Sequence, residues 1–225
     1  MNDSAGHSAV PVIHRDTVLA PTGDIRFGMV QRVSGWLIRL IGWKVVGTWP
    51  PVDKCVFMVA PHTSNWDFPI GLCAGFSSGI LLAWPYGFMM KDVMFRGPLG
   101  PIMRWLGGLS IDRSRPHAAV PQMAQVIAER ERFILAVTPE GTRSHRPHWK
   151  SGFYYISLEA KVPIVPVAFD YGLKEVGLGE PITLSGDREA DVEVFRRFYQ
   201  DVAPKRPENF GPIKFRDVEP AASPQ

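Results

Sequence analysis

The sequence has few cysteines and no pattern typical of a disulfide framework or a zinc site. Its two cysteines, Cys55 and Cys73, lie in apolar surroundings, and no C-x-x-C pair is present. We interpret both as reduced core residues of a cytosolic protein. The first residues also lack the basic start and apolar block of a secretory signal, so no such signal is predicted.

Charge is missing from two further segments. Residues 25–52 contain no acid, and residues 68–90 contain no charged side chain at all. The second segment is long enough to span a bilayer. However, its glycines and Pro85 divide it into a helix that ends near Ser77, a turn, and a strand "ILLAWP". A simple membrane span is therefore not predicted, although a half-inserted surface stays open.

The length and composition favour one folded domain. The chain has 225 residues, of which 45% are apolar, and its net charge is only +3. This is enough for a single sizeable core, and the mild charge gives no reason to expect a nucleic acid partner. We predict a domain over residues 25–215, between flexible tails at residues 1–24 and 216–225.

An amphipathic helix is predicted over residues 25–44. Its apolar residues recur at helical spacing, with Arg32 and Arg39 beside them; the stripe consists of Met29, Val33, Trp36, Leu40 and Trp43. Such a helix can lie in a lipid interface, with its arginines at the headgroups. The same stripe can instead pack on a sheet, and the sequence leaves both interpretations open.

The rest of the domain alternates short apolar runs with helical segments. The runs "KVVGTW", "CVFMVA", "ILLAW", "FMM", "LSI", "FILAV" and "PIVPVAF" read as strands, and the clearest helices cover about residues 118–132, 151–161 and 187–202. This alternation predicts an α/β fold, with a mixed β-sheet flanked by helices after the N-terminal amphipathic helix.

The stretch "VAPHTSNWD" places His62 and Asp67 directly after an apolar strand. On one continuous helix these two residues would not face each other, so a break between them is needed. With the helix starting near Ser64, the Asp67 carboxylate can accept from one imidazole nitrogen and leave the other free as a base. The alternative is a capping box, in which Ser64 and Asp67 only satisfy the start of the helix.

Three more blocks follow in order: "GGLSIDR" at residues 107–113, "TPEGTRS" at 138–144 and "VPIVPV" at 162–167. With the H-x4-D pair, these blocks resemble the four motifs of the glycerolipid acyltransferase superfamily, which includes the glycerol-3-phosphate and 1-acylglycerol-3-phosphate acyltransferases. The resemblance covers about residues 45–170. Four ordered motifs are a far more specific signal than H-x4-D alone.

The resemblance implies transfer of an acyl group from acyl-CoA or acyl carrier protein to a hydroxyl of a glycerolipid acceptor. His62 would be the general base, and Asp67 would fix its tautomer. Arginine forks suit a phosphate group, and the expected substrate-binding residues are Lys91, Arg113, Glu140, Gly141, Thr142 and Arg143. No cofactor and no metal are expected, since the acyl donor is itself a substrate.

Several of these residues also have structural interpretations. The arginines can form weak surface ion pairs with Asp112 and Glu140. Prolines are poor residues for a central strand, so "VPIVPV" is expected at a sheet edge or as a wall of the acyl site. The histidines of "HRPH" lack nearby carboxylates and read as a solvated loop. Neither a G-x-S-x-G elbow nor a phosphate-binding G-x-x-x-x-G-K-[ST] loop is present.

The acceptor and the location follow only as expectations. Lysophosphatidate is the default acceptor, while another lyso-lipid, such as a lyso-amino-acid lipid, stays open. A catalytically silent membrane-binding module with the same fold is the alternative from a different class. Because a lyso-lipid lives in the bilayer, the expected location is peripheral, on the cytoplasmic face of the cell membrane.

Overall fold

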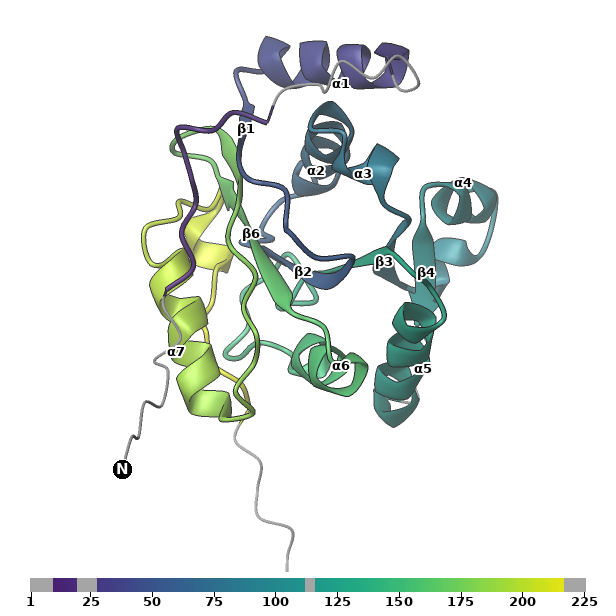
Figure 1. The fold of residues 1–225 in the computed structure, drawn as a ribbon, viewed down its shortest axis with the longest axis vertical. Helices are drawn as coiled ribbons and strands as arrows, with labels where there is room; N and C mark the ends of the chain where they lie inside the picture. The colour runs from purple at the N-terminus through teal and green to yellow at the C-terminus, as the bar shows by residue number, and fades with distance from the viewer. Residues whose placement is uncertain (1–9, 20–27, 112–115, 217–225) are drawn as a thin grey trace, which may run out of the picture.

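The computed structural model describes residues 10–19, 28–111 and 116–216, which form a seven-stranded sheet with helices on both faces (Figure 1). The strands are β1 (Lys44–Gly47), β2 (Lys54–Ala60), β3 (Tyr86–Lys91), β4 (Gly108–Ile111), β5 (Phe133–Val137), β6 (Ile164–Asp170) and β7 (Glu175–Leu178). The helices are α1 (Gly28–Leu40), α2 (Asp67–Ser77), α3 (Ile80–Ala83), α4 (Gly100–Trp105), α5 (Pro116–Ala128), α6 (Gly152–Ala160) and α7 (Arg188–Tyr199), with short 3-10 turns η2 (Asp92–Phe95) and η3 (Pro207–Asn209).

The sheet is mixed, as the sequence predicts. Its strand order is β1-β7-β6-β2-β5-β3-β4. Strands β6, β2, β5, β3 and β4 are parallel to one another. Strand β7 runs antiparallel to β6, and β1 runs parallel to β7. Strands β6, β2 and β5 are thus adjacent and parallel, so their carboxyl ends meet at the same edge of the sheet.

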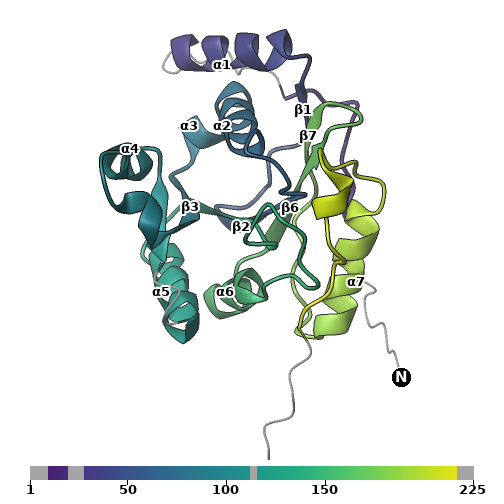
Figure 2. The same ribbon diagram turned by 180° about the vertical axis from the view of Figure 1, so that it is seen from behind.

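Two apolar cores lie on opposite faces of this sheet. One contains buried side chains from α5, α6 and α7, including Phe153, Phe195 and Tyr199. The other contains side chains from α1, α2 and α3, including Ile38 and Ile70. Both views show α1, α2 and α3 above the sheet and α5 and α6 below it (Figures 1 and 2). The two-sided burial explains why the central strands read as continuous apolar runs.

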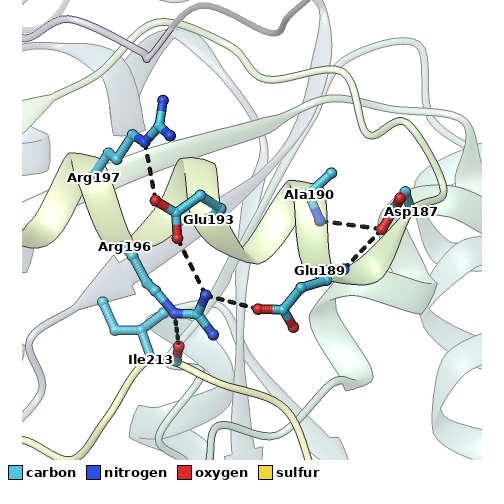
Figure 3. A network of polar contacts seen from close by, with 7 residues as sticks. All are labelled: Asp187, Glu189, Ala190, Glu193, Arg196, Arg197 and Ile213. Atoms are coloured by element: carbon cyan, nitrogen blue, oxygen red, sulfur yellow. Dashed lines mark hydrogen bonds and ion pairs between the residues drawn. The ribbon is translucent and has the colours of Figure 1, made fainter.

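Polar contacts fix α7 at its start and near its end (Figure 3). The Asp187 carboxylate caps the helix by accepting from the backbone N–H groups of Glu189 and Ala190, at 3.0 and 3.1 Å. One turn from the other end, Arg196 donates from Nε to the Ile213 carbonyl at 2.8 Å. This last bond joins α7 to the C-terminal segment that crosses it.

The predicted helix over residues 25–44 is shorter in the structure, where α1 ends before β1 begins. Gly42 has a φ of 76°, and the Trp43 N–H donates to the Ile38 carbonyl at 2.9 Å, as in a Schellman C-cap. Trp43 lies beyond the end of α1 and is only 6% exposed, so its predicted place in the stripe of this helix was wrong. Residues 25–27 lie outside the described part of the chain.

The predicted strand "ILLAWP" was also wrong, because residues 80–83 form α3. Gly79 takes a left-handed φ of 81°, and its carbonyl accepts from the N–H of Ala83 at 3.0 Å, which closes a helical turn. The next strand, β3, starts only at Tyr86, opposite Ile134 of β5. Strand β7, whose "EVGL" has no clear alternation, was not predicted at all.

The apolar block with two prolines does not lie at a sheet edge, which was one of its two expected places; its last residue, Val167, lines the pocket described below, in agreement with the other. Pro166 is inside β6, between β7 and β2. Strand β7 ends at Leu178, and the Pro166 carbonyl accepts from the next residue, Gly179, at 2.9 Å. The proline is tolerated because the hydrogen-bond ladder of the neighbouring strand stops at that point.

Part of the predicted N-terminal tail is bound to the sheet. Leu19 donates to the Val45 carbonyl at 2.9 Å, and Ile13 forms a bridge with Gly179. The prediction of a flexible tail over residues 1–24 was therefore wrong for residues 10–19. These residues run along β7 and β1 and cover that edge of the sheet.

Candidate active site

The candidate site lies where the parallel strands β2, β5 and β6 end side by side. His62 follows β2, Glu140 follows β5, and Tyr171 follows β6. After this edge the chain from β2 enters α2 on one face of the sheet, whereas the chain from β5 leads to α6 on the other face. Such a change of face opens a crevice at the carboxyl ends of the strands, where ligands bind in open α/β sheets.

His62 and Asp67 face each other across the start of α2. The loop after β2 carries His62, and its Nδ1 lies 3.1 Å from Oδ2 of Asp67, the first residue of the helix. Asp67 is buried, and its Oδ2 also accepts from the Ser64 N–H at 2.9 Å. Oδ2 of Asp67 thus makes both the capping contact with Ser64 and the contact with the His62 imidazole. The two interpretations of this motif, a capping box and a His–Asp pair, are therefore compatible.

Tyr171 is a further member of this cluster that the sequence analysis missed. Its hydroxyl donates to Oδ1 of Asp67 at 2.5 Å, and its ring packs edge-on against Trp43 at 4.8 Å between centroids. Burial and the Asp67 carboxylate raise the pKa of Tyr171, so the phenol stays a donor. The available signal was its position, directly after an apolar strand that runs parallel to the strand before His62.

Glu140 contacts the backbone of His62. Both of its carboxylate oxygens accept from the His62 backbone N–H, at 3.0 and 2.8 Å, and Glu140 is 4% exposed. Burial raises the pKa of Glu140 to about 8; the negative charge of Asp67 adds to this effect and the His62 N–H opposes it. The side chain therefore fixes the loop before the helix, and it does not line the pocket described below.

The other predicted residues are placed unequally. Gly141, Thr142 and the exposed Arg143 line the pocket, and Gly141 has a φ of 64° that favours glycine. Lys91 is the last residue of β3, but its side chain is not among the described parts. Arg113 lies outside the described residues.

An apolar pocket of about 470 Å³ opens at this edge and runs between the sheet and the helices α2 and α3. His62, Thr142 and Arg143 line its polar end. Its walls are hydrophobic and are formed by side chains that include Phe57, Phe68, Leu72, Leu81, Phe88, Met90, Ile134 and Phe169. A volume of this size fits a small-molecule ligand, and a few polar groups at one end of apolar walls suit an amphipathic one.

The raised pKa of Glu140 predicts how stability depends on pH. Because the folded state favours the protonated carboxyl, its stabilising effect is complete below a pH of 4.5 and is lost as the pH rises through about 8. The Glu140→Gln variant keeps an acceptor for the His62 N–H but cannot ionise. Its free energy of unfolding should therefore decline less over this window, by up to about 1.4 kcal/mol per pH unit. Urea unfolding at several pH values measures the slope.

Glu193, whose side chain is 44% exposed, provides the matched control for this experiment. Glu193→Gln removes a carboxylate whose pKa is lowered by Arg197 and Arg196, so it should leave the slope above a pH of 4.5 close to that of the wild type. Parallel slopes for Glu140→Gln and the wild type would contradict a neutral Glu140 in the folded protein.

Comparisons with known proteins identify the family of the chain. The family model "Acyltransferase" matches residues 26–170. A human 1-acyl-sn-glycerol-3-phosphate acyltransferase beta is 38% identical over 122 residues, which cover 45% of this chain and 44% of that protein. This chain thus matches less than half of the human relative. A 1-acyl-sn-glycerol-3-phosphate acyltransferase of Haemophilus influenzae is 24% identical over 201 residues, or 80% of each chain.

A solved structure shares the fold. The 1-acyl-sn-glycerophosphate acyltransferase of Thermotoga maritima superposes with a TM-score of 0.51 and 19% identity, covering 78% of each chain. The family model spans more than half of the sequence and includes β2, the His62–Asp67 cluster and the "EGTRS" loop. The chain belongs to the Acyltransferase family.

Proposed function

We propose that this protein transfers an acyl group from a thioester donor to a hydroxyl of a 1-acylglycerol-3-phosphate acceptor, with His62 and Asp67 as the general-base dyad. The main support is the 3.1 Å contact between His62 Nδ1 and Asp67 Oδ2 at the polar end of an apolar pocket. The relatives named 1-acyl-sn-glycerol-3-phosphate acyltransferase support the acceptor class.

The proposed reaction needs one proton acceptor and no acyl-enzyme. In the neutral tautomer with Nδ1–H bound to Asp67, Nε2 of His62 offers a free lone pair, and among the described residues it has no hydrogen-bond partner. Nε2 takes the proton of the acceptor hydroxyl as its oxygen bonds to the thioester carbonyl carbon. The C–S bond then breaks, and the leaving thiolate takes the proton from the imidazolium, whose charge Asp67 stabilises.

In this proposal the apolar pocket binds the acyl chain, and residues at its rim bind the acceptor phosphate. Hydrophobic walls receive a fatty acyl chain, because each methylene transferred from water contributes about 0.8 kcal/mol. Arg143, exposed beside Thr142 and Gly141, binds the acceptor phosphate through its planar fork. Lys91, the last residue of β3, and Arg113 of the "GGLSIDR" block keep their proposed roles at the acceptor phosphate. The donor is acyl-CoA or acyl carrier protein.

The central test is replacement of the proposed base. His62→Ala should lower kcat/KM by at least ~100-fold, the usual scale of general-base catalysis, without unfolding the protein. Thiol release is measured with acyl-CoA or acyl carrier protein as donor, and with lysophosphatidate or another lyso-lipid as acceptor. His145→Ala removes an exposed histidine of the neighbouring loop and should retain full activity. Near-normal turnover of His62→Ala would exclude this residue as the base.

The contact between Tyr171 and Asp67 gives a second prediction. Tyr171→Phe removes one hydrogen bond to the carboxylate and little volume. The His62–Asp67 pair should then hold a proton more tightly, so kcat should fall several-fold and the acid limb of the kcat/KM profile should move to higher pH. An unchanged pH profile with a lower melting temperature would assign Tyr171 to packing alone.

We also propose that α1 attaches the protein to the cytoplasmic face of the membrane. The buried face of α1 consists of Gln31, Ser34, Gly35 and a single large apolar residue, Ile38, whereas Trp36 and Leu40 are 57% and 65% exposed. Most large apolar side chains of this helix thus face away from the core, and the arginines Arg32 and Arg39 suit anionic headgroups. Within residues 10–19, 28–111 and 116–216, no helix is both long and apolar enough to cross a bilayer.

Vesicle flotation tests this attachment. Trp36→Ser with Leu40→Ser should release a folded protein from anionic vesicles, because both side chains are exposed and their loss leaves the core intact. Val12→Ser is the matched control. Val12 is similarly exposed, and it lies next to Ile13, which forms a bridge with Gly179 just after β7. If the double variant floats like the wild type, α1 does not anchor the protein.

A further inference from the structure

A second group of exposed apolar side chains lies on η2 and α4, far from α1 in sequence. We name it the η2–α4 surface; it consists of Val93, Met94, Leu99, Ile102 and Trp105. Val93 is 61% exposed and Trp105 is 82% exposed. Monomeric soluble proteins rarely gather so many large apolar side chains on one short segment, and such a patch marks an interaction surface.

The backbone of this segment has a fixed shape, so the exposure does not come from a loose loop. Phe95 is buried beneath it, and Arg104 stacks over the Phe95 ring at 5.6 Å. Gly100 lies against the Phe95 carbonyl, where a Cβ would approach to 2.2 Å. These contacts hold the segment in a defined conformation with its apolar side chains outward.

The surroundings of the surface favour an anionic partner. The sequence from Asp92 to Ile111 contains one acid, Asp92, and two basic residues, Arg96 and Arg104. Arg96 is mostly exposed and is paired with Asp92 at the start of η2. An exposed tryptophan and aliphatic residues beside arginines are typical of segments that lie at the depth of lipid headgroups.

The surface is continuous with the pocket. Val93 and Met94 are exposed, and both also line the apolar pocket that contains His62. An acyl chain that enters the pocket past these residues therefore crosses the η2–α4 surface. If this surface faced water, the chain would have to be hydrated on its way; if it lies in a lipid interface, the chain stays in apolar surroundings throughout.

The position of α4 agrees with this direction of entry. Leu81, Leu82 and Ala83 of α3 share a shallow hollow with Arg104 and Trp105 of α4, so the two helices are neighbours. Both views show α4 beside α3, on the side of the sheet that carries α1 and α2, and away from α7 (Figures 1 and 2). The two exposed apolar surfaces thus flank the helices that cover the pocket.

We propose that the η2–α4 surface inserts into the headgroup region of an anionic bilayer and forms a lipid contact separate from α1, beside the pocket opening. It orients the protein so that the lyso-lipid acceptor passes from the bilayer to His62 without crossing water. This inference rests on the proposed function for the identity of the lipid, whereas the insertion itself is independent of catalysis.

The test uses the full chain and vesicles of phosphatidylcholine and phosphatidylglycerol. The triple variant Leu99→Ser, Ile102→Ser, Trp105→Ser changes only residues outside the pocket lining. We expect its vesicle affinity to fall at least ~10-fold, because insertion scales with buried apolar area. Its transfer to a soluble short-chain lysophosphatidate should persist, while transfer to the vesicle-embedded acceptor falls. Val12→Ser again serves as the control and should bind like the wild type.

A spectroscopic measurement keeps the test independent of that variant's folding. Brominated lipids should quench a component of the wild-type tryptophan fluorescence that is missing in Trp105→Phe. Absence of this component, or wild-type flotation of the triple variant, would overturn the proposal. A change from dimer to monomer in the triple variant would do the same, because the surface would then bind a second copy. If the wild type transfers no acyl group to the soluble acceptor, the proposed function fails, while flotation and quenching still decide the insertion.

Discussion

The buried carboxylate of Asp67 is the interaction on which the site depends. A carboxylate removed from water is costly unless its oxygens are satisfied, and here they receive hydrogens from His62, Ser64 and Tyr171. These three donors come from the loop after β2 and from the end of β6. The loop therefore has one arrangement in which the charge is compensated, and that arrangement also orients the imidazole.

Glu140 completes this arrangement from the other side of His62. It contacts the backbone of His62, whereas Asp67 contacts the ring, so the two carboxyl groups fix different degrees of freedom of the same residue. Burial is the main reason why the pKa of Glu140 is raised and its neutral form favoured, and the nearby Asp67 charge adds to this effect. The acid of the "EGTRS" block is thus a positioning group for the histidine of the first block.

Local sequence patterns predicted the α/β class, the clearest helices and the His62–Asp67 pair, because each depends on residues that are close along the chain. They did not predict Tyr171, which meets Asp67 only when β6 and β2 pair. They also misassigned residues 80–83, because a short apolar run has no periodicity that separates a buried strand from a buried helix. Trp43 was misplaced because its helical spacing continued past Gly42, where the backbone turns away.

The two faces of the sheet are filled differently. On the face of α5, α6 and α7, aromatic side chains such as Phe153 and Phe195 pack closely against each other, whereas the face of α2 and α3 contains the cavity. Side chains that border a cavity already lack some neighbours, so exchanging one apolar residue for another there costs less stability than in a close-packed core. Descendants of this chain can therefore vary the shape of the cavity wall freely during evolution, while the opposite face preserves the fold through those changes.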